Sequence, residues 1–180
     1  MNILTLQVRP ADKFPEPAFS QLQRLVFADV QRESGLLDEA LAAEAAMGGS
    51  QHTYTPIFRV GAWRGDELVG WSWGWMERTR SFYMANSGVV AAQRRQGVYT
   101  ALLEAVRAHA LTQGAVALRS QHSVLNNPVI IAKLRQGFHV SGLSQSAQMG
   151  TLVELTCHLS APRQAMYRDR SIPFVPKAPA

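Results

Sequence analysis

The chain has 180 residues, of which 47% are hydrophobic and 17% charged, and its formal net charge is +5. This composition predicts one globular domain with a hydrophobic core, and no apolar stretch is long enough to cross a bilayer. The single cysteine, Cys157, excludes an internal disulfide and a multi-cysteine metal site.

The first half of the chain predicts a strand, two helices and three further strands. Residues 3–8 alternate in polarity and predict the first strand. An amphipathic helix follows, with its apolar positions at Phe19, Leu22, Leu25, Val26 and Val30. An alanine-rich helix over 36–47 ends at two glycines. Two apolar runs, 56–63 and 67–76, flank a Gly65-Asp66 turn and predict a hairpin, and residues 81–90 predict the next strand.

The second half predicts two helices that alternate with strands. Apolar residues recur at helical spacing from Val98 to Ala110, and a strand over 115–121 follows. Asn127 caps the next helix, with Pro128 at its first position. Its expected buried stripe is Ile130, Ile131 and Leu134, and it ends at Gly137. Residues 138–143 and 151–159 predict the last strands, and the tail from Pro162 predicts an arm or a disordered segment.

This order predicts an α/β or α+β single domain. The strand, helix and strand within 84–121 form a parallel crossover inside an otherwise antiparallel sheet. The N-terminus has no basic segment followed by a long apolar one, so we expect a cytoplasmic protein that does not bind membranes. The positive charge favours an anionic partner. No run of Lys or Arg exceeds two, which favours a phosphorylated cofactor over nucleic acid.

The sequence VVAAQRRQGVYTALL, residues 89–103, contains two arginines and a glycine between a predicted strand and the predicted helix that follows it. The first turn of a helix has main-chain N–H groups without intrahelical partners, and the helix dipole adds positive charge there. Gly97 has no Cβ to hold an anion away, and Arg94 and Arg95 add full charges. These features predict a phosphate or diphosphate site. An ordinary helix start with solvated arginines is the alternative.

Two motifs together resemble the GNAT superfamily of N-acetyltransferases. The first is Arg94-x-x-Gly97-x-Tyr99, and the second is Asn126, eleven residues ahead of the pair Gly137-Phe138. The resemblance implies a GNAT-like mixed sheet, mostly antiparallel and of about seven strands, flanked by helices and with a splayed parallel pair at the cofactor site. It implies one acetyltransferase domain over residues 1–160, followed by a proline-containing tail over 161–180.

The resemblance also implies an activity, the transfer of an acetyl group from acetyl-CoA to an amine by direct attack in a ternary complex. The acceptor is a small-molecule or peptide amine of unknown identity. A module that binds coenzyme A without catalysis and acts as a sensor is the alternative. A homodimer is a further expectation, because strands near the C-terminus leave sheet edges.

By similarity, three groups of residues bind the cofactor. The main chain around the diphosphate comprises Arg94, Arg95, Gln96, Gly97, Val98, Tyr99 and Thr100. The strand that pairs with the pantetheine arm contains Ser87, Gly88 and Val89. Asn126 contacts the cofactor near its thiol, although a loop or capping role is the alternative for this residue.

The usual catalytic side chains of the family are absent at two positions. Gln121 stands where some members have a glutamate base, and Lys133 stands where they have a tyrosine acid. The remaining candidates are His122 as a base, Glu77 acting through a water, and Tyr83 as a donor to the leaving sulfur. Each has a simpler interpretation: an exposed loop histidine, a surface acid and a core aromatic. For Lys133 we expect a solvated position on the helix surface.

Three tryptophans alternate along one strand, so Trp71, Trp73 and Trp75 face the same side, with Gly70, Ser72 and Gly74 opposite. They form either an aromatic wall for an acceptor or part of the core between helix and sheet. Cys157 alternates with apolar residues and is expected to be buried. We expect no metal, because four of the histidines show no ligand spacing: His52, His109, His139 and His158.

Overall fold

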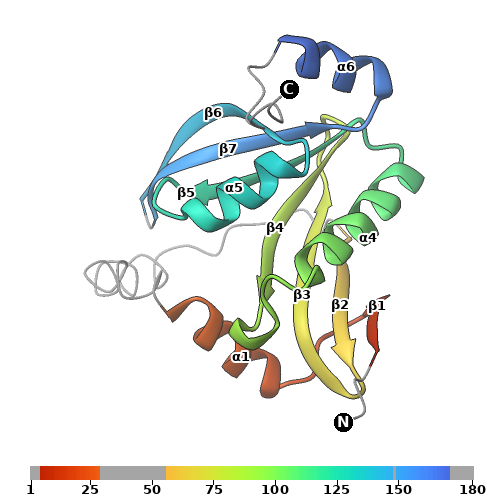
Figure 1. Cartoon of the computed structure of the whole chain (residues 1–180), viewed down its shortest axis with the longest axis vertical. Helices are drawn as coiled ribbons and strands as arrows, with labels where there is room; N and C mark the ends of the chain where they lie inside the picture. Colours follow the sequence, from red (N-terminus) through yellow and green to blue (C-terminus); the bar gives the residue numbers. More distant parts are fainter. Residues whose placement is uncertain (1–4, 29–55, 148, 171–180) are drawn as a thin grey trace, which may run out of the picture.

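The computed structural model describes residues 5–28, 56–147 and 149–170. Within them, seven strands form one sheet in the order β1-β2-β3-β4-β5-β7-β6 (Figure 1). The strands are β1 (Leu6–Pro10), β2 (Phe58–Arg64), β3 (Glu67–Met76), β4 (Ser81–Val89), β5 (Ala117–Ser123), β6 (His139–Ser146) and β7 (Gly150–His158). Neighbouring strands are antiparallel except for β4 and β5, which are parallel. This arrangement confirms the predicted fold class.

Four helices accompany the sheet in the described residues: α1 (Ala18–Val26), α4 (Val98–Thr112), α5 (Asn127–Arg135) and α6 (Ala161–Arg170). A short 3₁₀ turn, η1 (Ala91–Gln93), lies between β4 and α4. The predicted hairpin is correct, because β2 and β3 pair on either side of Gly65 and Asp66. The predicted helix over 36–47 lies outside the described residues.

The main hydrophobic core lies between α4 and one face of the sheet. Phe82 of β4, Leu118 of β5 and Leu155 of β7 belong to it, together with Leu102 of α4. Gly70 allows this packing, because a Cβ there would lie 3.1 Å from Val98 and 3.2 Å from Leu102. The glycine therefore fixes how closely α4 approaches β3.

The other face of the sheet carries a smaller aromatic core beneath α1. Trp71 is fully buried there with Phe14, and its ring meets Phe19 edge to face at a centroid distance of 5.2 Å. Trp73 packs against the same cluster. The three tryptophans thus share one face, as their alternation predicted, and for Trp71 the core interpretation holds.

An extra residue in β4 changes which side chains face each side of the sheet. Trp73 pairs with Asn86 and Gly74 pairs with Met84, so Ala85 has no partner on β3. Such a bulge reverses the alternation of the strand beyond it. Tyr83 and Asn86 therefore both lie on the α1 face, whereas Met84 and Val89 lie in the core beneath α4.

The parallel pair separates after three residue pairs. Ser81, Phe82 and Tyr83 pair with Ala117, Leu118 and Arg119, and no pairing joins the rest of the two strands. Figure 1 shows β4 and β5 running apart from this point. The predicted splay is therefore present, and it leaves the β5-facing edge of β4 unpaired from Met84 onward.

Some local predictions were wrong. Leu25 is 76% exposed, because α1 packs on the sheet through Phe19, Leu22 and Val26. The tail expected to be an arm or disordered is helical from Ala161 to Arg170. This helix is held by a bond from Gln164 Nε2 to the His158 carbonyl (2.7 Å), and Tyr167 stacks on His139. Cys157 is buried as predicted.

The helix α5 differs most from its prediction. Its N-cap is Asn126, one residue earlier than expected, so that Pro128 occupies the second helical position. Ile131 is 37% exposed, and Ile130 and Leu134 are only partly buried. The one fully buried residue of α5 is Lys133, so its expected solvated position was wrong.

Candidate active site

The loop before α4 has a backbone that favours anion binding. Arg95 and Gly97 both adopt left-handed conformations, with φ of 61° and 78°. Gly97 is the N-cap of α4 and provides no side-chain cap for it. Apart from its own residue, its chain neighbours and the adjacent helix backbone, no atom lies within 4 Å of the position that a Cβ on Gly97 would occupy. Main-chain N–H groups at the start of α4 are therefore open to a ligand.

Most side chains of this loop and of the first turn of α4 contact the protein itself. Arg94 Nε donates to the Val89 carbonyl at 3.1 Å, and Gln96 Nε2 donates to the Ala92 carbonyl at 2.8 Å. Val98 is buried in the core and Tyr99 packs against it. Thr100 Oγ1 accepts from Gln136 Nε2 at 3.1 Å. This arrangement leaves the main chain, together with the exposed side chain of Arg95, to face a ligand.

The unpaired part of β4 contains the three residues expected to face the pantetheine arm. Ser87 Oγ is 2.8 Å from Ser72 Oγ on β3. Gly88 packs under Trp71, and a Cβ there would lie 2.5 Å from the indole ring. Asn126, at the start of α5, makes no side-chain cap to its helix. The main chain of β4 is thus held from the β3 side, and its opposite edge stays unpaired.

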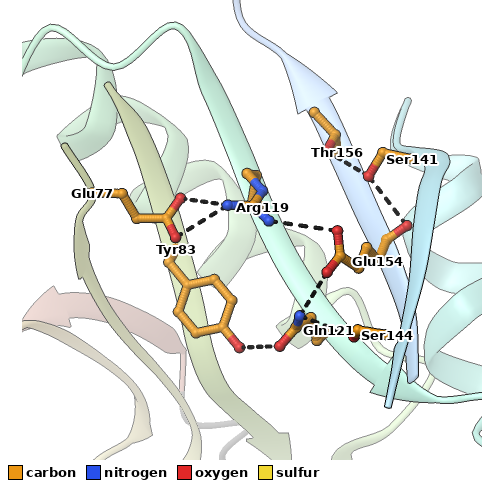
Figure 2. A network of polar contacts seen from close by, with 8 residues as sticks. All are labelled: Glu77, Tyr83, Arg119, Gln121, Ser141, Ser144, Glu154 and Thr156. Carbon is orange, nitrogen blue, oxygen red and sulfur yellow. Dashed lines mark hydrogen bonds and ion pairs between the residues drawn. The ribbon is translucent and has the colours of Figure 1, made fainter. Parts of the chain in front are cut away.

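A polar network crosses the opening between β4 and β5 on the α1 face (Figure 2). The Tyr83 hydroxyl donates to Gln121 Oε1 at 3.2 Å, and Gln121 Nε2 donates to Glu154 Oε1 at 2.8 Å. Arg119 joins two carboxylates, with NH1 2.9 Å from Glu77 Oε2 and NH2 3.5 Å from Glu154 Oε2. The two carboxylates and one guanidinium carry a net formal charge of −1.

Glu154 is a site residue that the sequence analysis missed. It pairs in register with Gln121 on the neighbouring strand. β7 thus places a carboxylate directly beside the amide of Gln121. An isolated acid in the apolar strand sequence TLVELTCHL was the only signal in the sequence, and it could not reveal which residue would lie opposite.

The predicted candidates Tyr83, Glu77 and His122 occupy different environments. Burial raises the pKa of Tyr83, and the charge of Glu77 adds to this, so the phenol stays protonated near neutral pH. Both oxygens of Glu77 accept from Arg119 NH1. His122 lies on the opposite face of β5 from Gln121, with Nε2 3.1 Å from Ser120 Oγ. Burial, together with the charge of Lys133, lowers the pKa of His122 to about 3.

Lys133 reaches the same opening from the other face of the sheet. Its Nζ lies 3.2 Å from Met84 Sδ on β4 and 4.3 Å from the centre of the Phe138 ring. Met84 directly follows the last residue of β4 that pairs with β5. The opening is therefore bordered by Tyr83 and Gln121 on one face, and by Lys133 and His122 on the other.

Comparison with known proteins explains this combination of a splayed parallel pair and an anion-binding loop. The model of the acetyltransferase (GNAT) family matches residues 20–138, which is more than half of the chain. The chain belongs to the GNAT acetyltransferase family. It is therefore an acetyltransferase, and acetyl-CoA is the acetyl donor that this family uses. No curated protein sequence matches it as a relative.

Solved structures with the GNAT fold resemble the described chain at low sequence identity. The ribosomal-protein-S18-alanine N-acetyltransferase from Escherichia coli has a TM-score of 0.64 at 12% identity, covering 87% of this chain and 95% of that one. A GNAT acetyltransferase from Elizabethkingia anophelis, solved with acetyl-CoA bound, has a TM-score of 0.60 at 15% identity, covering 85% and 97%.

Nourseothricin acetyltransferase has a TM-score of 0.54 at 21% identity, covering 58% of this chain. The match spans 66% of that enzyme's own length. These likenesses show a shared fold.

Proposed function

We propose that this GNAT acetyltransferase binds acetyl-CoA between β4 and β5 and transfers the acetyl group directly to an amine bound on the α1 face. The observation that carries the proposal is the end of β4–β5 pairing after Tyr83, next to a loop with two left-handed residues and open space at Gly97. The unpaired edge of β4 supports a binding place for an extended arm, and the loop at Gly97 supports a binding place for a diphosphate.

The residues present fit the cofactor at both ends. The main chain from Arg95 to Thr100 would hold the diphosphate, and the edge of β4 at Ser87, Gly88 and Val89 would pair with the pantetheine arm. Asn126 lies at the start of α5 and would contact the arm near its thiol. When bound, acetyl-CoA supplies an acetyl thioester, and main-chain N–H groups of β4 can polarise its carbonyl.

The acceptor we propose is a cationic amine. The net charge of −1 on Glu77, Arg119 and Glu154 attracts an ammonium group. The rings of Trp75 and Tyr83 lie 5.2 Å apart on the same face, and Trp73 lies 6.0 Å from Trp75. Aromatic faces bind cations, so Trp73 and Trp75 supply the acceptor wall. Trp71 is fully buried and does not contribute to it.

Glu154 is the base that the geometry favours for deprotonating this amine. Its carboxylate lies beside Gln121, which holds it in place by a bond of 2.8 Å. His122 is a poor base, because a histidine with a pKa of about 3 binds a proton weakly at neutral pH. Glu77 instead orients Arg119. We expect Glu154→Gln to lower kcat by about 100-fold and to change CoA affinity little.

The predictions about cellular location and oligomeric state remain proposals. We propose a cytoplasmic protein; among the described residues, no helix is long and apolar enough to span a bilayer. We also propose a homodimer, because β6 lies at the sheet edge and exposes Val140 and Leu143. Sedimentation showing a particle of one chain's mass would contradict the dimer.

Two glycine variants test the diphosphate site. Gly97→Glu places a bulky acid where we propose the diphosphate, so the affinity for CoA, measured by titration calorimetry, should fall by more than about 100-fold. Gly114→Glu is the matched control, because Gly114 has φ of 73° and open space around it but lies beyond the other end of α4. Its backbone strain is similar and its CoA affinity should be retained. Equal affinities in the two folded variants would contradict the site.

Release of the CoA thiol, followed with a panel of amines, tests the catalytic part of the proposal. We expect cationic primary amines to give the highest kcat/KM, and Trp75→Ala to lower it. Tight CoA binding without turnover on any amine would support the sensor module instead.

A further inference from the structure

Lys133 is the most unusual charged residue in the described chain, because it is 1% exposed and has no carboxylate partner. None of the ion pairs among the described residues involves it. Among the described residues, its three N–H donors have one acceptor, the thioether of Met84 at 3.2 Å, and a thioether accepts weakly. Burying an ammonium group in this way is unfavourable by several kcal/mol unless another group interacts with it.

Lys133 Nζ is located relative to the strands by its contact with Met84. Met84 is the first residue of β4 beyond its pairing with β5, and His122 lies on β5 beyond Arg119, the last residue that pairs with β4. Lys133 is close enough to His122 for its charge to lower the pKa of that imidazole, in addition to the effect of burial. Lys133 therefore lies on the core face of the sheet, at the point where the two strands begin to separate.

We propose that Lys133 is the general acid of the transfer and protonates the sulfur of the departing coenzyme A. This inference rests on the proposed function, which places the pantetheine arm along the unpaired edge of β4. The inner end of that edge, at Met84, is where Lys133 is held.

The step balances in atoms and charge. The acceptor ammonium group first loses one proton through Glu154 to water. The neutral amine nitrogen then bonds to the acetyl carbon and loses a second proton to Glu154, and the carbon–sulfur bond breaks with its electron pair on sulfur. Lys133 gives that sulfur one proton from its ammonium group. The neutral Lys133 amine then takes a proton from water, and Glu154 returns one to water.

The acidity of Lys133 suits this role. Burial lowers the pKa of Lys133 to about 7, and Cys157 of β7 opposes this shift. Two titratable groups lie near Lys133, His122 on β5 and Cys157 on β7. The Cys157 sulfur accepts a hydrogen bond from Arg107 of α4 at 3.5 Å. A thiol has a pKa of ~8.5, so proton transfer from this ammonium to a thiolate is favourable by roughly 30-fold. From an ordinary lysine it would be unfavourable by roughly 100-fold.

The other candidates for the acid are less suitable. His122 is neutral at pH 7 and has no proton to give from an imidazolium. The Tyr83 hydroxyl donates to Gln121 on the α1 face, and its pKa is raised. Lys133 alone among these groups is both a stronger acid than a thiol and protonated to a large extent at pH 7.

A magnetic resonance experiment tests the contact with sulfur without relying on turnover. The chain has three lysines, Lys13, Lys133 and Lys177, so labelling lysine Cε with ¹³C gives three signals. The signal that is missing from the spectrum of Lys133→Met belongs to Lys133. We expect the Lys133 signal to titrate near pH 7. CoA should shift it, whereas an analogue with hydrogen in place of the thiol should bind and shift it far less. Equal shifts with both compounds, or none with either once bound, would overturn the proposal.

Kinetics provide the second readout. Lys133→Met and Lys133→Arg should both lower kcat by about 100-fold and leave the Kd for CoA within about threefold, because arginine keeps its charge but does not release a proton. The alkaline fall of kcat with pH should disappear in both variants. Arg135→Met, on the exposed side of the same helix, is the control and should match the wild type. Near wild-type kcat in Lys133→Met, with the loss found in Tyr83→Phe instead, would overturn the proposal.

These outcomes separate the two proposals. Failure of the unaltered protein to bind CoA would remove the proposed function and the role of Lys133 together. Binding of CoA without a change in the Lys133 signal would contradict only the role of Lys133.

Discussion

At the scale of single residues, Lys133 shows how the site is built at the expense of stability. The Met84 thioether and the Phe138 ring replace only part of the hydration that the ammonium group loses on burial. A methionine at this position would fill similar space without a charge. We therefore expect Lys133→Met to stabilise the fold even as it lowers activity, a trade that catalytic sites often show.

The pH dependence of stability tests the burial of Lys133. Its pKa is about 7 in the folded protein and ordinarily 10.5, so between these values the unfolded chain holds a proton that the folded chain lacks. The free energy of unfolding should therefore rise with pH, by about 2 kcal/mol from pH 7 to pH 9. Lys133→Met should remove this rise. Urea denaturation at fixed ionic strength measures the free energy of unfolding of the unaltered protein and of Lys133→Met across this pH range. Parallel curves for these two proteins would show that Lys133 is solvated.

At the scale of elements, the bulge in β4 brings the two halves of the site together. Before Ala85, Tyr83 faces the acceptor side; after it, Ser87 and Val89 lie in the stretch that we assign to the cofactor. Gly74 on β3 lies at this bulge, and a Cβ there would collide with the main-chain carbonyl of Tyr83. The contact between the two strands therefore requires glycine.

Substitution of Gly74 tests the importance of this contact. Gly74→Ala should lower the free energy of unfolding by about 2 kcal/mol, because the carbonyl it meets belongs to a paired strand and cannot rotate away. Gly142→Ala on β6 is the matched control, since its Cβ would first meet the flexible carboxylate of Glu154 at 3.2 Å. Thermal denaturation compares them, and equal losses in the two variants would be inconsistent with a rigid contact at Gly74.

The sequence predicted elements well where the signal was local. The β2–β3 hairpin follows from alternation and a Gly65-Asp66 turn, and α4 follows from a regular apolar stripe that ends near Gly114. Features set by distant packing were missed. Nothing in the helix sequence shows that Lys133, rather than Ile131, faces the core, and nothing local places Glu154 opposite Gln121.

At the scale of the whole molecule, the sheet separates two chemical environments. The core beneath α4 is apolar and holds Lys133 and His122 with little charge, whereas the α1 face carries Glu77, Arg119 and Glu154 beside the aromatic row. The opening between β4 and β5 connects them. An amine can thus lose its proton on one face while the sulfur gains a proton from the other.

The most direct test of this account is a crystal structure of the protein with coenzyme A. We expect the diphosphate to be bound by the main chain from Arg95 to Thr100, and the pantetheine arm to lie along Ser87, Gly88 and Val89. The sulfur should end within hydrogen-bonding reach of Lys133 Nζ. Coenzyme A bound elsewhere, or side chains of the protein filling the space between β4 and β5, would contradict the account.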